Sequence, residues 1–208
     1  MNVPAPCVSD NADMRLLVLL TVAATLPLRA DIPEPARKLV AAARSQIGVT
    51  TLYDPAYVKL AYPDGDVPED RGVCTDVVIR AFRKMGKMGL DLQKLVHEDM
   101  AAAFSKYPQQ WGLKSPDANM DHRRVPNLVR FLERAGKKIT VTKNAADYRP
   151  GDIVTCIVPP HLPHVMLVCD VASPVEPHRF QVIHNIGAGA QMEDRLFDFE
   201  ITGHFRYW

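Results

Sequence analysis

The order of the hydrophobic patterns along the chain constrains the fold more than any other feature of the sequence. Up to residue 135, apolar residues recur at helical spacing, and beyond residue 137 they gather in short, β-branched runs. We predict helices at 32–46, 74–86, 91–104 and 126–135, and strands at 138–141, 151–158, 164–171, 179–184 and within 196–208. Helices followed by antiparallel strands predict an α+β fold, with the N-terminal helices packed on one face of a C-terminal antiparallel sheet.

The composition is that of one ordinary globular domain. The chain has 208 residues, of which 47% are hydrophobic and 24% charged, so it is long enough to bury a substantial core. Its formal net charge is +1 and no block of Lys and Arg stands out, which argues against nucleic acid as a partner. We expect a single domain over residues 31–208 that acts as a monomer.

The N-terminus has the pattern of an export signal. Met14 and Arg15 precede an apolar stretch, 16–28, that is too short to span a bilayer and fits the hydrophobic region of a signal peptide. We therefore predict a signal peptide over 1–30, cleaved after Ala30, with a spurious or disordered leader and the true start at Met14. The alternative is an uncleaved membrane anchor. After cleavage we expect no integral membrane domain, and a location in the periplasm or cell envelope of a bacterium.

Export would place the remaining cysteines, Cys74, Cys156 and Cys169, in an oxidising compartment. If the runs on either side of residues 159–163 form a hairpin, Cys156 lies near Val165 and Cys169 near Asp152. The two sulfur atoms would then be too far apart for a disulfide. We predict that the protein contains no disulfide and that Cys74 is free.

Cys74 is predicted to stand at the start of a helix. Unpaired N–H groups and the helix dipole favour an anion there, so we expect the pKa of the thiol to be lowered. A thiolate is the nucleophile that a cysteine hydrolase needs. The alternative is that Cys74 is simply a small residue of the core.

A nucleophilic cysteine needs a base and a group that orients the base. His164 opens the most strongly β-like run of the chain and is the candidate base; the alternative is a turn histidine whose ring lies in water. His184 and Asn185 end the next strand. Because successive strand residues face opposite ways, at most one of them points toward His164, and the sequence leaves open which one does.

Two further polar clusters have other interpretations. The cluster at 97–99 lies within a predicted helix and is interpreted as a solvated face. The residues His122, Arg123 and Arg124 follow Asp121 ahead of a helix, where the arginines could bind an anionic or peptide-carboxylate group. An ion-pair cluster between loop and helix is the favoured interpretation. No zinc-binding spacing exists, so we expect no metal and no cofactor.

Several motifs resemble known families. The segments Cys74-Thr75-Asp76, Arg149-Pro150-Gly151-Asp152-Ile153-Val154, His164-Val165-Met166-Leu167-Val168 and His184 resemble, in this order, the NlpC-type papain-like cysteine peptidases of bacterial cell walls. Longer segments, 53–55, 72–81, 121–127 and 184–190, resemble a family of exported bacterial proteins known mainly as a domain of unknown function.

The peptidase resemblance implies a papain-like fold with Cys74 as nucleophile, His164 as base and His184 as its orienting partner. It also implies an upstream tyrosine that assists the oxyanion, with Tyr53 as the best match and Tyr57 and Tyr62 as alternatives. The usual nucleophile motif is Asp-Cys-Ser-Gly, so Asp76 replaces a glycine in the turn that would face the substrate.

These observations lead to a hypothesis of an exported cysteine hydrolase that cleaves amide bonds, with peptidoglycan peptides as the expected substrate. One alternative is a catalytically inactive envelope module of the same fold that binds wall peptides or a partner. Another is a papain-like amidase or acyltransferase that acts on a substrate other than peptidoglycan.

Overall fold

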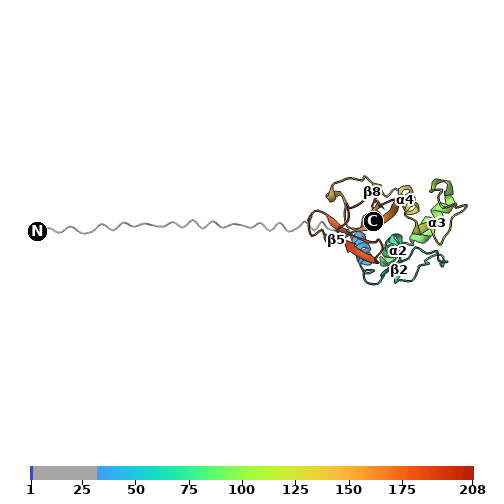
Figure 1. Cartoon of the computed structure of the whole chain (residues 1–208), viewed down its shortest axis with the longest axis horizontal. Coiled ribbons are helices and arrows are strands. Elements are labelled where there is room, and N and C mark those ends of the chain that lie inside the picture. Colours follow the sequence, from blue (N-terminus) through green and yellow to red (C-terminus); the bar gives the residue numbers. More distant parts are fainter. Residues whose placement is uncertain (2–31) are drawn as a thin grey trace. The chain divides into compact units, whose positions relative to one another are not determined.

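The structure is a computed structural model that describes Met1 and residues 32–208. The predicted signal peptide, its cleavage site and the start at Met14 lie outside the described residues. Residues 32–208 form one compact unit of mixed α+β structure (Figure 1). No helix within the described residues has the length and apolar character needed to cross a membrane.

Within residues 32–208, four α-helices lie where the hydrophobic pattern predicts them. They are α1 (Glu34–Arg44), α2 (Cys74–Arg83), α3 (Leu92–Ala102) and α4 (Val125–Arg134). Local sequence explains their starts: the Asp91 carboxylate accepts the Gln93 N–H at 3.1 Å and caps α3, and Pro126 stands in the first turn of α4. Four short 3₁₀ turns accompany them, η1 (Gly86–Met88), η2 (Phe104–Lys106), η3 (Asp121–Arg123) and η4 (Ala145–Asp147).

The C-terminal half forms a six-stranded antiparallel sheet in the order β3-β8-β4-β5-β6-β7. Its strands are β3 (Lys138–Ile139), β4 (Ile153–Val158), β5 (Leu162–Ala172), β6 (Phe180–Asn185), β7 (Ala190–Glu193) and β8 (Glu200–Phe205). Strand β7 was not predicted. It has four residues at the edge of the sheet, too few for a recognisable hydrophobic alternation.

The two faces of the sheet support separate cores. Val165, Leu167 and Ile183 pack with the buried faces of all four helices. Met166 and Val182 belong to a second, smaller core on the other face, which the loops carrying Tyr148 and Leu196 cover. Because side chains alternate along a strand, His164 and His184 share the face of this second core, whereas Asn185 shares the helix-covered face.

The β4–β5 hairpin has a different register from the one predicted. Cys156 pairs with His164, one residue away from the expected Val165. The Pro-rich turn at 159–160 sets this register through its geometry, which the hydrophobic pattern does not encode. Cys74, Cys156 and Cys169 are buried free thiols.

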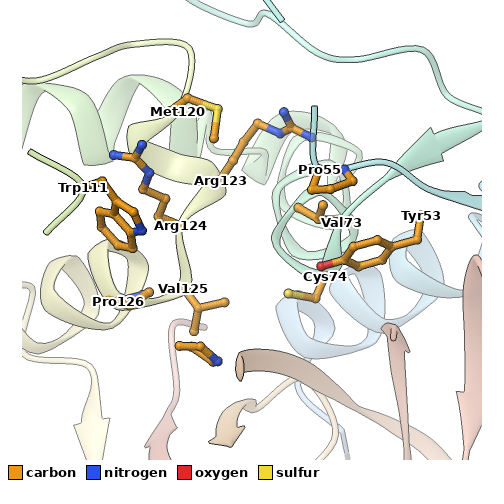
Figure 2. A pocket seen from close by; sticks show the side chains of 11 residues that line it. Tyr53, Pro55, Val73, Cys74, Trp111, Met120, Arg123, Arg124, Val125 and Pro126 are labelled. Atoms are coloured by element: carbon orange, nitrogen blue, oxygen red, sulfur yellow. The ribbon is translucent and has the colours of Figure 1, made fainter. Parts of the chain in front are cut away.

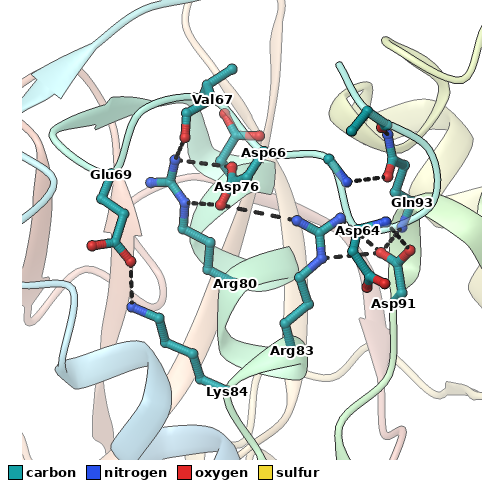
Figure 3. A network of polar contacts seen from close by, with 12 residues as sticks. Asp64, Asp66, Val67, Glu69, Asp76, Arg80, Arg83, Lys84, Asp91 and Gln93 are labelled. Carbon is teal, nitrogen blue, oxygen red and sulfur yellow. Dashed lines mark hydrogen bonds and ion pairs between the residues drawn. The ribbon is translucent and has the colours of Figure 1, made fainter.

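A small parallel pair brings a distant loop to the start of α2. Strand β1 (Leu52–Tyr53) pairs with β2 (Arg71–Gly72), and Cys74 follows two residues later. The buried Arg80 side chain of α2 holds this loop by donating to Asp66 at 2.8 and 3.0 Å and to the carbonyl of Val67 (Figure 3). The position of Tyr53 relative to Cys74 is therefore set by secondary structure and by the ion pair of the buried Arg80 with Asp66.

Candidate active site

Cys74 is the first residue of α2, as predicted. The turn in front of it is stabilised by Asp76, whose carboxylate accepts the Val73 N–H at 2.7 Å. Gly72 allows this contact, because a Cβ atom at this position would lie 2.9 Å from the Asp76 carboxylate. The unusual residue pattern around Cys74 is therefore a helix cap.

The prediction that Asp76 faces the substrate is wrong. Its side chain is only 3% exposed and accepts hydrogen bonds from Arg123 Nε at 3.1 Å and Nη2 at 3.0 Å. Arg123 also donates to the backbone carbonyls of Asp54 and Ala56. Buried charges are stable in proteins when they are paired and fully hydrogen-bonded, as both are here. Arg123 therefore joins α2 to the loop that follows Tyr53. For this residue of the 121–124 cluster, the structure agrees with the interpretation as an ion pair between loop and helix.

The expected lowering of the Cys74 pKa is also wrong. Burial of the thiol raises its pKa to about 11, and the negative charge of Asp76 adds to this effect. The N–H groups of Val165, Thr75 and Cys74 itself act in the opposite direction but are outweighed. The side chain is 5% exposed, so the loss of hydration exceeds the effect of the helix terminus. Cys74 is a neutral thiol at pH 7.

The sulfur of Cys74 lies near the start of β5, the strand that carries His164, because the Val165 N–H lowers the pKa of the thiol by hydrogen bonding. Burial, and after it the charge of a Cys74 thiolate, raises the pKa of Cys156 to about 12. Cys156 is the register partner of His164. No hydrogen bond joins the Cys74 sulfur to the His164 ring among the described residues, and His164 stands on the sheet face away from the helices.

His164 belongs to a chain of three hydrogen-bonding side chains. Its Nε2 lies 2.8 Å from His184 Nδ1, and His184 Nε2 lies 2.8 Å from a Glu193 carboxylate oxygen. The three residues come from the adjacent strands β5, β6 and β7. The sequence analysis missed Glu193, because its strand was not predicted and only the pairing of β6 with β7 brings it beside His184.

Both histidines are neutral at pH 7. Burial, and after it the positive charge of a protonated His184, lowers the pKa of His164 to about 3. Burial also lowers the pKa of His184, against the opposing effect of Glu193. The hydrogen bond between the two rings agrees with the predicted pairing of His164 with His184. The alternative, a turn histidine whose ring lies in water, is wrong, because His164 is only 4% exposed.

Asn185 has a different role from the one considered for it. Its side-chain amide donates to the carbonyls of Gly72 at 3.0 Å and Leu52 at 3.3 Å. It therefore holds β1 and β2 against the sheet from the helix-covered face. This geometry favours His184 over Asn185 as the partner of His164.

Cys74 opens into a cleft of about 190 Å³ (Figure 2). We call Tyr53, Val73 and Cys74 the Cys74 wall, and Trp111, Met120 and Arg124 the Trp111 wall; Figure 2 shows the two on opposite sides of the cleft. The Tyr53 ring points its hydroxyl end toward Cys74. Its pKa is raised, first by desolvation and then by the charge of a Cys74 thiolate, so the phenol is a neutral hydrogen-bond donor beside the sulfur. Tyr57 and Tyr62 do not line the cleft.

The three candidate residues at 122–124 are separated by the structure. His122 is buried away from the cleft, where burial lowers its pKa to about 3 and its Nδ1 has no partner among the described residues. Arg123 pairs with Asp76. Arg124 lies at the cleft with its guanidinium carbon 4.3 Å from the centre of the Trp111 ring.

The interpretation of residues 97–99 as a solvated helix face is wrong for two of the three. His97 Nδ1 lies 2.8 Å from the buried Asp121 carboxylate, and Asp99 accepts from Tyr107 and Arg134. These contacts join α3 to η3 and α4, which periodicity alone does not reveal. Within the described residues, no group of three or more His, Cys, Asp or Glu side chains is arranged to hold a metal ion.

Comparison with known proteins identifies the family. The model of a family described as "Domain of unknown function (DUF1287)" matches residues 40–207. The chain belongs to the DUF1287 family. It is 49% identical to "Uncharacterized protein YijF" of Escherichia coli (strain K12) over 208 residues, which cover 95% of this chain and 98% of the relative. No solved structure matches the chain.

Proposed function

We propose that this DUF1287 protein is an exported cysteine hydrolase that cleaves amide bonds, with peptidoglycan peptides as substrate, and that its fold is a papain-like, NlpC-type variant. The observation that carries the proposal is the hydrogen-bonded chain His164–His184–Glu193, together with a cysteine that begins a helix and lines the same cleft as Pro163, the residue before His164. The helices on one face of an antiparallel sheet agree with the proposed fold.

The hydrogen bonds determine which nitrogen of His164 is the base. An ionised carboxylate can only accept, so Glu193 requires the proton of neutral His184 to be on Nε2. His184 Nδ1 is then an acceptor and receives a hydrogen bond from His164 Nε2–H. The lone pair of His164 is therefore on Nδ1, which has no protein partner among the described residues and is not among the fully buried unpaired atoms. We propose that this nitrogen accepts the proton of Cys74.

With both groups neutral, the reaction begins by general-base catalysis. As the Cys74 sulfur attacks the substrate carbonyl and an S–C bond forms, its proton moves to His164 Nδ1. His164 then gives this proton to the leaving nitrogen, the C–N bond breaks, and the amine departs from a thioester. Water attacks the thioester with loss of a proton to His164, the S–C bond breaks, and the proton returns to the Cys74 sulfur.

In this proposal two groups stabilise the oxyanion. They are the backbone N–H of Cys74, in the unpaired first turn of α2, and the hydroxyl of Tyr53. Glu193 and His184 stabilise the imidazolium that forms on His164 during the reaction, which compensates for the low pKa that burial imposes on the resting ring.

Release of soluble muropeptides from purified sacculi, followed by mass spectrometry, tests the proposal. We expect the full chain to release them and Cys74→Ser to lose at least about 1,000-fold in rate, because no other nucleophile replaces the sulfur. Cys169→Ser is the matched control, since Cys169 is a buried thiol of the helix-side core, and it should retain activity. Equal release by wild type and Cys74→Ser would refute the proposal.

The raised pKa of Cys74 favours a second candidate, a non-catalytic module that binds wall peptides through the same cleft. Co-sedimentation with sacculi separates the two. A binding module would sediment without releasing muropeptides, and replacement of Cys74 by Ala would leave both results unchanged.

A further inference from the structure

Arg124 differs from the other arginines near the cleft in having no acidic partner. Arg80, Arg83 and Arg123 pair with Asp66, Asp91 and Asp76 at 2.7–3.0 Å. Arg124 forms no ion pair within the described part of the chain, and its Nη1 is a buried nitrogen without a hydrogen-bond acceptor. A buried charged donor without an acceptor is costly, which indicates that a ligand group completes the site.

The position of Arg124 is built by the fold. Its guanidinium stacks over Trp111, whose backbone φ of 59° lies in the left-handed region that a bulky residue rarely adopts. Such strain persists only where other interactions maintain it, and it concentrates at functional sites. Trp111 is also 52% exposed, so core packing does not explain its conformation. The stack fixes the planar guanidinium. Its Nε and Nη2 form no hydrogen bond among the described residues and are not among the fully buried atoms, so they are available to a planar anion.

The cleft has no negative charge of its own. Its two charged lining residues are Arg123, which Asp76 neutralises, and Arg124. Its volume of about 190 Å³ is below the range of about 300–1,000 Å³ that is typical of drug-sized ligands. Because Arg124 and Cys74 line the same small cleft, a substrate group bound by Arg124 lies close in sequence to the carbonyl that the sulfur of Cys74 would attack.

We propose that Arg124, stacked on Trp111, binds a carboxylate of the substrate, so that the site prefers amide bonds next to a residue with a free carboxylate. This inference rests on the proposed function for the location of the scissile bond. The carboxylate could be the C-terminus of a peptide or an acidic side chain, and both present the planar pair of oxygens that a guanidinium binds through two hydrogen bonds.

Binding is tested without catalysis in the full-length Cys74→Ala variant. The probes are N-acetyl-alanyl-alanine as free acid and as C-terminal amide, and N-acetyl-alanyl-glutamate amide beside its glutamine counterpart. Affinity is read from the Trp111 indole N–H signal in ¹⁵N NMR. We expect at least one acid to bind about 10- to 100-fold more tightly than its neutral counterpart, and the pair that shows this names the source of the carboxylate.

Adding Arg124→Gln should abolish that preference, and a circular dichroism spectrum equal to that of Cys74→Ala shows that the variant is folded. Arg124→Lys should retain part of the preference, because it keeps the charge but not the planar pair of donors. Arg37→Gln, on the exposed face of α1, should have no effect.

Equal affinity for acid and neutral probes, or a preference that survives Arg124→Gln, would overturn the inference. Failure of wild type to cleave any probe or sacculus would instead refute the proposed hydrolase. The two failures are therefore distinguishable.

Discussion

The Cys74 wall and the Trp111 wall of the cleft use their polar groups in opposite ways. Behind the Cys74 wall, Asp76, Arg123 and Asn185 complete their hydrogen bonds within the protein. In the Trp111 wall, Arg124 immediately follows Arg123 in sequence and keeps an unpaired nitrogen. The difference indicates that the first wall is assembled during folding, whereas the second is completed by a ligand.

The largest expected effect separates these two neighbouring arginines. Arg123→Ala leaves the Asp76 carboxylate buried without its partner, and should lower the free energy of unfolding by about 3–5 kcal/mol. Arg124→Ala loses only the contact with Trp111 and should cost no more than about 1 kcal/mol. Urea denaturation of both variants measures the difference. Equal losses would show that both walls are structural.

Acid should destabilise the fold through its buried neutral histidines. The pKa of His122, behind the cleft, and that of His164 are lowered from 6.5 to about 3. Below pH 6.5 the unfolded chain binds protons that the folded chain excludes, so stability falls as the pH decreases from 6.5 toward 3. Each histidine can contribute up to about 4 kcal/mol to this loss.

His122→Gln should remove part of that pH dependence, since the side chain no longer titrates. Unfolding free energies at pH 7 and pH 4 provide the measurement, with His178→Gln, an exposed residue of the β5–β6 loop, as the control. If His122→Gln and His178→Gln have the same slope with pH as the wild type, the titration of His122 does not contribute.

The sequence predicts those parts of the fold and the site that local interactions determine. The 3.6-residue period, Asp91 and Pro126 locate the helices, and the position of Cys74 at the start of α2 follows from the same pattern. Partners distant in sequence are not predictable in this way. Asp76 meets Arg123 from 47 positions away, and this pairing turns a predicted substrate contact into a structural ion pair.

Burial is the other property that the local pattern of Cys74 does not provide. The helix terminus was expected to lower the pKa of the thiol, but the packing of the sheet end around the sulfur raises it to about 11. About one thiol in ten thousand is then ionised at pH 7. The enzyme hypothesis consequently depends on a base that removes the proton during attack, and therefore on the tautomer of His164.

Glu193 is the residue through which that tautomer can be tested, and its expected effect is the smallest. Glu193→Gln replaces a group that can only accept a hydrogen bond with an amide that can also donate one to His184. The tautomer of His184, and through it that of His164, is then no longer fixed, so Nδ1 of His164 is not always free of a proton. We expect kcat/KM for amide cleavage to fall by about 10- to 100-fold, as is typical of residues that orient a functional group. The free energy of unfolding should change little, because Glu193 is half-buried at the sheet edge.

A second measurement distinguishes this role from a structural one. In wild type, ¹⁵N NMR should show His184 protonated on Nε2 and His164 on Nε2, and Glu193→Gln should produce a mixture of tautomers. Glu133→Gln, at a half-buried position in the last turn of α4, is the matched control and should leave both rings unchanged. If the wild type instead carries the His164 proton on Nδ1, this nitrogen is a hydrogen-bond donor and cannot accept the proton of Cys74. The Cys74 wall would then bind substrate without acting as part of a hydrolase.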